Sequence, residues 1–176
     1  KQGNRMNILL GTISVIHETW LPYASGCLIS YCKKIPAINQ KYRFFDPIYK
    51  YKPLEEYNEL FAQTDIFGLT CYVWNQSYND QLMKHYKTIN PKGITMYGGP
   101  NVPEDPELAQ QFADQRSYID IHWVGPGEKL LANYLENIDQ PIYTHQGSFG
   151  STWNNVEVGR KLYQIDIDQM PTPYID

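Results

Sequence analysis

The clearest strand signal in this chain is the run Asp65-Ile66-Phe67-Gly68-Leu69-Thr70-Cys71-Tyr72-Val73. A short, nearly continuous apolar run of this kind is typical of a strand that is buried on both faces of a parallel sheet. Met6-Asn7-Ile8-Leu9-Leu10-Gly11-Thr12-Ile13 has the same character near the N-terminus. Each run is followed by a polar loop, so we expect both to be strands of an α/β domain.

Strands and helices alternate around these two runs. We expect further strands at 42–45, 94–97 and 119–124, and helices at 21–34, 53–62, 78–89, 103–112 and 129–137. Early prolines, acidic residues near helix starts and one-sided apolar patterns favour these helices. The alternation predicts a doubly wound, flavodoxin-like, five-stranded parallel sheet with helices on both faces. Such a sheet binds its ligand beyond the carboxyl ends of the strands.

Composition and charge exclude several classes of protein. Apolar residues make up 42% of the chain and charged residues 19%, which is globular composition. A net charge of −4 without a Lys/Arg run disfavours a nucleic-acid partner. No apolar stretch approaches the ~20 residues of a membrane span. Three cysteines, Cys27, Cys32 and Cys71, favour a reducing cytoplasm over a disulfide framework.

The loop after the first strand lacks common cofactor and catalytic signatures. Ser14-Val15-Ile16-His17-Glu18-Thr19 holds no glycine-rich turn for a dinucleotide and no flavodoxin-type phosphate loop. The chain has no GxSxG elbow. Its histidines, at 17, 85, 122 and 145, have no close metal-ligand spacing. We therefore predict neither a hydrolase nor a metal site in this chain.

Two glycine-rich loops follow predicted strands. Gly98-Gly99-Pro100 comes after the fourth strand, where paired glycines let a large group approach the backbone. The two adjacent glycines are also explained by a tight turn that needs a residue with positive φ. Gly125-Pro126-Gly127-Glu128 comes after the fifth strand. Its glutamate opens the next helix, where it either contacts a ligand or only complements the helix dipole.

The end of the third strand holds polar and aromatic candidates. The Thr70 hydroxyl either faces the ligand crevice or bonds to neighbouring backbone. Tyr72, Trp74 and Asn75 form an aromatic loop that ends in an amide. Such a loop suits a flat ligand with polar edges, although aromatic residues are also ordinary core residues.

In this order the motifs resemble those of one family. The stretch 65–75, Tyr97-Gly98-Gly99-Pro100, Val124-Gly125-Pro126-Gly127-Glu128 and Pro171-Thr172-Pro173-Tyr174-Ile175-Asp176 are similar to motifs of the N-terminal cobalamin-binding domain of cobalamin-dependent radical S-adenosylmethionine (SAM) enzymes. The resemblance covers 6–137 and the final residues. It departs from the family at Pro126, where a glutamate is usual.

The resemblance implies a cobalamin-binding Rossmann-type fold that holds cobalamin base-off at the carboxyl ends of the strands. The residues expected to contact the cofactor are Thr70, Tyr72, Trp74, Asn75, Gly98, Gly99, Pro100, Gly125, Gly127 and Glu128. The nucleotide tail would descend past Thr70 and Gly98-Gly99, and the corrin face would meet the aromatic loop. His17 lacks the Asp and Gly of the DxHxxG motif, with Val15 and Trp20 in their places, so we expect no histidine ligand to cobalt.

The resemblance also sets the expected domain organisation. We expect Met6 to be the natural start and residues 1–5 a cloning remnant. Residues 6–138 would be the cobalamin-binding domain, and 139–176 an extension and connector toward a radical SAM barrel outside this chain. In the family the barrel holds a 4Fe–4S cluster on CxxxCxxC and cleaves SAM, commonly for methyl transfer. This chain has no CxxxCxxC, so alone it should be inactive, and we expect no catalytic residue in it.

Two other functions stay open at this stage. One is a flavodoxin-like interaction domain that has lost the cofactor and docks on a partner barrel. The other is a small nucleotide- or flavin-binding enzyme. Bound cobalamin would colour the protein red to orange, flavin would colour it yellow, and an interaction domain would be colourless.

Overall fold

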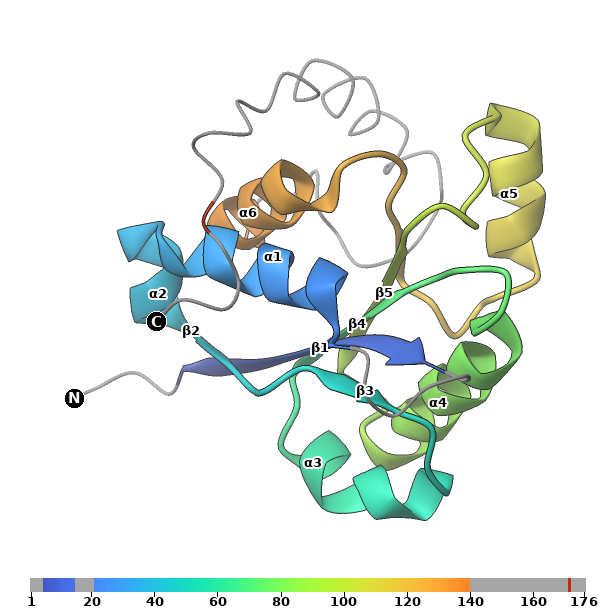
Figure 1. Ribbon diagram of the computed structural model, residues 1–176, viewed down its shortest axis with the longest axis horizontal. Coiled ribbons are helices and arrows are strands. Elements are labelled where there is room, and N and C mark those ends of the chain that lie inside the picture. The colour runs from blue at the N-terminus through green and yellow to red at the C-terminus, as the bar shows by residue number, and fades with distance from the viewer. Residues whose placement is uncertain (1–4, 15–20, 140–170, 172–176) are drawn as a thin grey trace.

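A parallel sheet runs through the centre of the molecule in the computed structural model, which describes residues 5–14, 21–139 and 171 (Figure 1). Its strands are β1 (Met6–Ser14), β2 (Tyr42–Phe44), β3 (Ile48–Lys50), β4 (Ile66–Thr70), β5 (Ile94–Gly98) and β6 (Ile121–His122). Their order is β2-β1-β4-β5-β6, with β3 also paired to β1. Every pairing is parallel.

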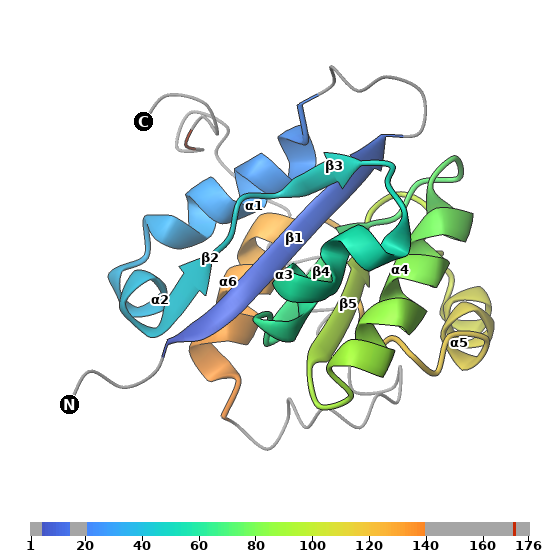
Figure 2. The same cartoon turned by 90° about the horizontal axis from the view of Figure 1, so that it is seen from below.

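The segments β2 and β3 together take the place of one edge strand. They follow one another along the same edge of β1, where Met6 pairs with Tyr42 and Gly11 with Ile48 (Figure 2). Pro47 lies between them and has no N–H to donate to the ladder. Counted as one strand, they give the order second, first, third, fourth, fifth, which is the flavodoxin-like order. The predicted fold is confirmed; the predicted strand at 42–45 corresponds to β2, and β3 was not predicted.

Helices cover both faces of this sheet (Figures 1 and 2). On one face lie α1 (Tyr23–Lys33), α2 (Pro36–Lys41) and α6 (Gly127–Asn137). On the other lie a 3₁₀ turn (Leu54–Tyr57), α3 (Asn58–Ala62), α4 (Gln76–Ile89) and α5 (Pro106–Asp114). Because α1 follows β1 and α4 follows β4, the chain leaves these adjacent strands toward opposite faces. The gap between β1 and β4 is therefore the topological switch point.

Each face has its own apolar core. Leu9 of β1 packs on the α4 side and Leu10 on the α1 side, and both are buried. Phe67 and Ile66 of β4 divide between the faces in the same way. This two-sided burial explains why the central strands are continuous apolar runs, because side chains alternate between two cores.

Several helix boundaries differ from the predicted ones. The helix expected from residue 103 begins at Pro106, because the Asp105 side chain accepts hydrogen bonds from the backbone N–H groups of Glu107 and Leu108, both at 3.0 Å. The helix expected at 53–62 splits into the 3₁₀ turn and α3. The short helix α2 was not predicted; Pro36, expected only to follow α1, is also its first residue.

Candidate functional site

A pocket opens at the switch point, between the sheet and helices α1 and α6. The carboxyl ends of β1, β4 and β5 form its floor. Its volume is about 180 Å³, larger than the roughly 150 Å³ cavity that can take up a benzene ring. The pocket is lined by eight of the ten residues singled out from the sequence: Thr70, Tyr72, Gly98, Gly99, Pro100, Gly125, Gly127 and Glu128.

The floor of the pocket depends on two glycines of the strands. A Cβ atom added at Gly68 would lie 2.8 Å from a methyl of Leu10 and 2.9 Å from Cγ of Met96. A larger residue there would force these side chains to move. A Cβ at Gly98 would meet only Cβ of Trp123, at 3.5 Å, which is an ordinary contact. The space beside Gly98 is therefore open to a ligand.

Two other pocket glycines have a conformational role. Gly99 has φ of 104° and Gly125 has φ of 100°, in the region that other residues rarely adopt. A Cβ at Gly99 would also lie 2.8 Å from the carbonyl oxygen of Cys71. Gly99 is therefore needed for a tight turn with positive φ, which was one of the two explanations for the glycine pair. Gly98 does not have a positive φ.

Three hydroxyl groups meet beside the pocket. Thr12 Oγ1 lies 2.7 Å from Ser25 Oγ and donates to Thr70 Oγ1 across 3.2 Å. These residues come from β1, α1 and β4, the elements that flank the switch point. Thr70 and Ser25 also line the pocket. Thr70 thus bonds to a neighbouring side chain and still borders the ligand space.

The loop after β4 presents an apolar surface at the pocket rim. The rings of Tyr72 and Trp74 stack, with centroids 4.5 Å apart and an interplanar angle of 11°. Trp74 is 52% exposed and Val73 76% exposed. Tyr72 lines the pocket and Trp74 does not. Exposed, stacked aromatic side chains of this kind can support a flat ligand that extends beyond the pocket.

Asn75 lies behind this loop and not in the pocket lining. Its side chain is fully buried. The oxygen accepts hydrogen bonds from the Tyr72 N–H at 2.9 Å and the Asn79 amide at 3.1 Å, and the amide donates to the carbonyls of Ile13 and Thr70. These bonds use the whole amide, so Asn75 fixes the loop and is not free to contact a ligand.

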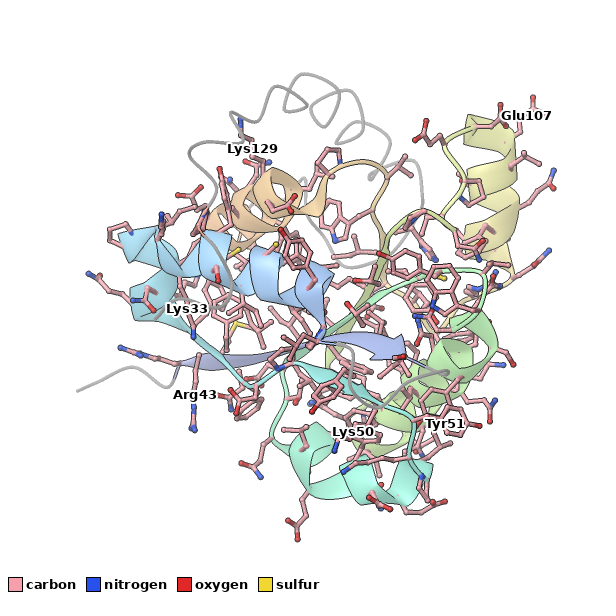
Figure 3. All side chains as sticks on the ribbon, in the orientation of Figure 1. Lys33, Arg43, Lys50, Tyr51, Glu107 and Lys129 are labelled. Carbon is pink, nitrogen blue, oxygen red and sulfur yellow. The ribbon has the colours of Figure 1, made fainter. Side chains whose placement is uncertain are left out.

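Glu128 brings the negative charge of the pocket. It lies in the first turn of α6, half-buried in the wall that faces α1. Burial, followed by the charge of Glu128, raises the pKa of Cys32 to about 12. Neither lysine nor arginine lines the pocket among residues 5–14 and 21–139, and the neighbouring Lys129 points away from the sheet (Figure 3). The pocket is therefore suited to a neutral ligand that can donate a hydrogen bond to this carboxylate.

The cysteines and histidines of the described part form no metal centre. Cys27, Cys32 and Cys71 are buried free thiols, and no group of three or more possible metal ligands occurs in residues 5–14 and 21–139. His122 packs between Tyr97 and Phe112, outside the pocket. His17 lies outside the described residues. None of the described helices is long and apolar enough to cross a membrane.

Several residues of the pocket were not predicted from the sequence. Gly68 lies two residues before Thr70 on the same strand face, so strand periodicity could have identified it. Trp123 likewise lies two residues before Gly125; its indole N–H is buried and has no hydrogen-bond partner among the described residues. No signal marked Ser25, because its place in the wall depends on how α1 docks on the sheet.

Comparison with known proteins finds no matching family model. The chain is 32% identical over 162 residues to the cobalamin-dependent radical SAM methyltransferase TokK of Streptomyces tokunonensis, covering 89% of this chain. It is 29% identical over 127 residues to the 2-(S-pantetheinyl)-carbapenam-3-carboxylate methyltransferase of Streptantibioticus cattleyicolor, covering 71% of this chain. These alignments span only 23% and 18% of the two relatives. The chain therefore matches only a short part of each of these two relatives.

Proposed function

We propose that this chain is the cobalamin-binding part of a cobalamin-dependent radical SAM enzyme of the methyltransferase type. The observation that carries the proposal is the pocket at the switch point, lined by eight of the ten residues identified from the sequence. Similarity to TokK, whose name states dependence on cobalamin, supports the same assignment.

The pocket suits the dimethylbenzimidazole base at the end of the nucleotide tail of base-off cobalamin. Dimethylbenzimidazole is a flat, mostly apolar group, and the volume of about 180 Å³ admits such a ring. Leu10, Leu28 and Leu131 provide apolar wall, and Gly98 leaves open space beside β5. The tail would descend past Thr70 and Gly98-Gly99, between the sheet and the two helices.

The aromatic loop after β4 would lie against the corrin ring. Tyr72 and Trp74 stack at the rim, and the exposed Trp74 and Val73 extend the apolar surface away from the pocket. Asn75 would support this loop from behind through its four hydrogen bonds, without contacting the ring. Glu128 would accept a hydrogen bond from a hydroxyl or amide of the cofactor.

The remaining parts of the proposal concern the whole protein. Residues 6–138 would form the cobalamin-binding domain, and 139–176 the connector toward a barrel that holds the 4Fe–4S cluster and SAM. The bound cobalamin would supply methyl-transfer chemistry, and this chain would bind and orient it. No histidine of the chain would ligate cobalt, and the chain alone would not cleave SAM.

Equilibrium dialysis against hydroxocobalamin tests the proposal. The 176-residue chain should retain one cobalamin with micromolar affinity, about −8 kcal/mol. Circular dichroism of the same sample shows whether it is folded. A folded chain that retains no cobalamin would overturn the proposal and favour the interaction domain that has lost its cofactor.

A further inference from the structure

The indole N–H of Trp123 is a buried hydrogen-bond donor in a residue that lines the pocket. The side chain is 7% exposed, and its nitrogen has no hydrogen-bond partner among the described residues. Most buried polar groups in proteins are paired, and leaving a donor unpaired destabilises the fold. Because Trp123 lines the pocket, an acceptor on the ligand is the partner that this donor lacks.

Packing holds the Trp123 ring in place. The backbone N–H of Trp123 donates to the carbonyl of Tyr97 at 2.6 Å. The indole packs edge to face against Tyr134 of α6, with the ring centroids 5.7 Å apart. Tyr134 is itself buried. The indole therefore cannot turn out to water, and its N–H has to be paired inside the protein.

A hydrogen-bond acceptor lies in the same pocket. Glu128 is half-buried in the first turn of α6 and also lines the pocket. An ionised carboxylate accepts hydrogen bonds and donates none. No cationic side chain from the described part of the chain lines the pocket beside it. A neutral ligand therefore satisfies both Trp123 and Glu128 only if it carries an acceptor and a donor.

Dimethylbenzimidazole meets this requirement only in part. Once linked to the ribose it has no N–H, and it keeps one ring nitrogen with a single lone pair. The hydroxyl of Thr70, which also borders the pocket, would take that lone pair and leave Trp123 unpaired. Adenine is a flat base of similar size, with several ring nitrogens that accept and an amino group that donates. It can pair with Thr70, Trp123 and Glu128 together.

We propose that Trp123 and Glu128 determine the choice of lower base, and that the pocket prefers a cobamide whose lower base is adenine over cobalamin. The indole N–H donates to a ring nitrogen of the adenine, and the carboxylate accepts from its amino group. This inference deepens the proposed function and rests on it. Cobalamin binds in the same pocket, but its base leaves both groups without a partner.

Equilibrium dialysis with quantification of cobalt compares adeninylcobamide with cobalamin in the wild-type chain, Trp123→Phe, Glu128→Met and Glu128→Gln. Phenylalanine keeps an aromatic ring without the N–H. Methionine keeps the length of glutamate without its oxygens, and glutamine, the matched control, keeps an acceptor oxygen. The ratio of the two affinities within one protein cancels effects on the corrin site, and comparing ratios between proteins cancels the cost of detaching each base from cobalt. Circular dichroism shows whether each variant is folded.

The wild type should bind adeninylcobamide at least about tenfold more tightly than cobalamin. This preference should fall about fivefold in Trp123→Phe and in Glu128→Met, equivalent to about 1 kcal/mol in each, and persist in Glu128→Gln. If Trp123→Phe does not fold, Glu128→Met decides. A wild type that binds cobalamin without this preference, or an unchanged ratio in either folded variant, would overturn the inference and leave the proposed function intact. If the wild type binds neither cobamide, the proposed function fails and the inference with it.

Discussion

The two faces of the sheet share the same strands but are built for different tasks. On β4, Phe67 fills the core beneath α4, whereas Gly68 and Thr70 open onto the pocket beneath α1 and α6. On β5, Tyr97 is buried toward α4, and Gly98 leaves space on the pocket side. Because strand side chains alternate, one strand can stabilise the fold through one face and leave room for a ligand on the other. Substitutions on the α4 face should therefore reduce stability, and substitutions on the pocket face should reduce binding.

The largest expected effect is loss of stability in Phe67→Ala. Phe67 is fully buried, and its ring lies 5.0 Å from that of Phe61 and 5.2 Å from that of Tyr86. Removing it should lower the free energy of unfolding by about 3–5 kcal/mol in urea denaturation. Leu108→Ala, at a 55% exposed position of α5, is the control and should cost less than about 0.5 kcal/mol. Similar losses in the two variants would contradict the described core.

A residue on the α4 face should also make the free energy of unfolding depend on pH. Burial, followed by the positive charge of Arg116, lowers the pKa of His122 from 6.5 to about 4. The unfolded chain takes up a proton on this histidine near pH 6.5, and the folded chain does so only near pH 4. The free energy of unfolding should therefore fall as the pH drops through this window, by up to about 3 kcal/mol.

Denaturation of the wild type and His122→Gln at pH 7.5 and pH 5 measures this contribution. The variant should lose less stability between the two pH values than the wild type does. Equal losses in both proteins would show that other groups cause the acid sensitivity. Cobalamin affinity at pH 7.5 should be unchanged, because His122 does not line the pocket.

The strongest effect on binding is expected for Gly98→Val. The added side chain would occupy open space next to Trp123, and a β-branched residue suits a strand. Cobalamin affinity should fall at least about 30-fold, or about 2 kcal/mol, with the free energy of unfolding changed by less than about 1 kcal/mol. The decrease in cobalamin affinity should be smaller in Gly98→Ala than in Gly98→Val. Normal affinity in Gly98→Val would mean that the ligand does not enter this pocket.

The smallest effect is expected for Thr70→Val. Loss of one hydrogen bond to the ligand should cost about 0.5–1.5 kcal/mol of cobalamin affinity, while Thr70→Ser should bind almost as the wild type does. Absorption titrations of the two variants measure the difference. If serine and valine weaken binding equally, then the methyl group of Thr70 matters and its hydroxyl does not.

The sequence was sufficient to predict the strand order and to identify the loops at the carboxyl ends of the strands. Apolar runs such as Ile66–Thr70 identify strands, and connection rules then limit the topology. Local patterns could not predict the split of the edge strand around Pro47. Local patterns also could not show the direction of the Asn75 side chain, because that direction depends on the turn that Asn75 stabilises. Nor could they show that Ser25 of α1 approaches β1. These features depend on tertiary contacts between segments distant in the sequence.

Electron paramagnetic resonance of bound cob(II)alamin shows whether the nucleotide base has left cobalt. If the nucleotide tail lies in the pocket between α1, α6 and the sheet, its base cannot also ligate cobalt. We therefore expect one cobalt per chain and a signal without nitrogen superhyperfine splitting. Splitting that persists in His17→Ala would show the base still on cobalt and the tail outside the pocket, and splitting lost in that variant would show histidine ligation. Either result, or a folded chain that retains no cobalt, would contradict base-off cobalamin binding without a histidine ligand in this pocket.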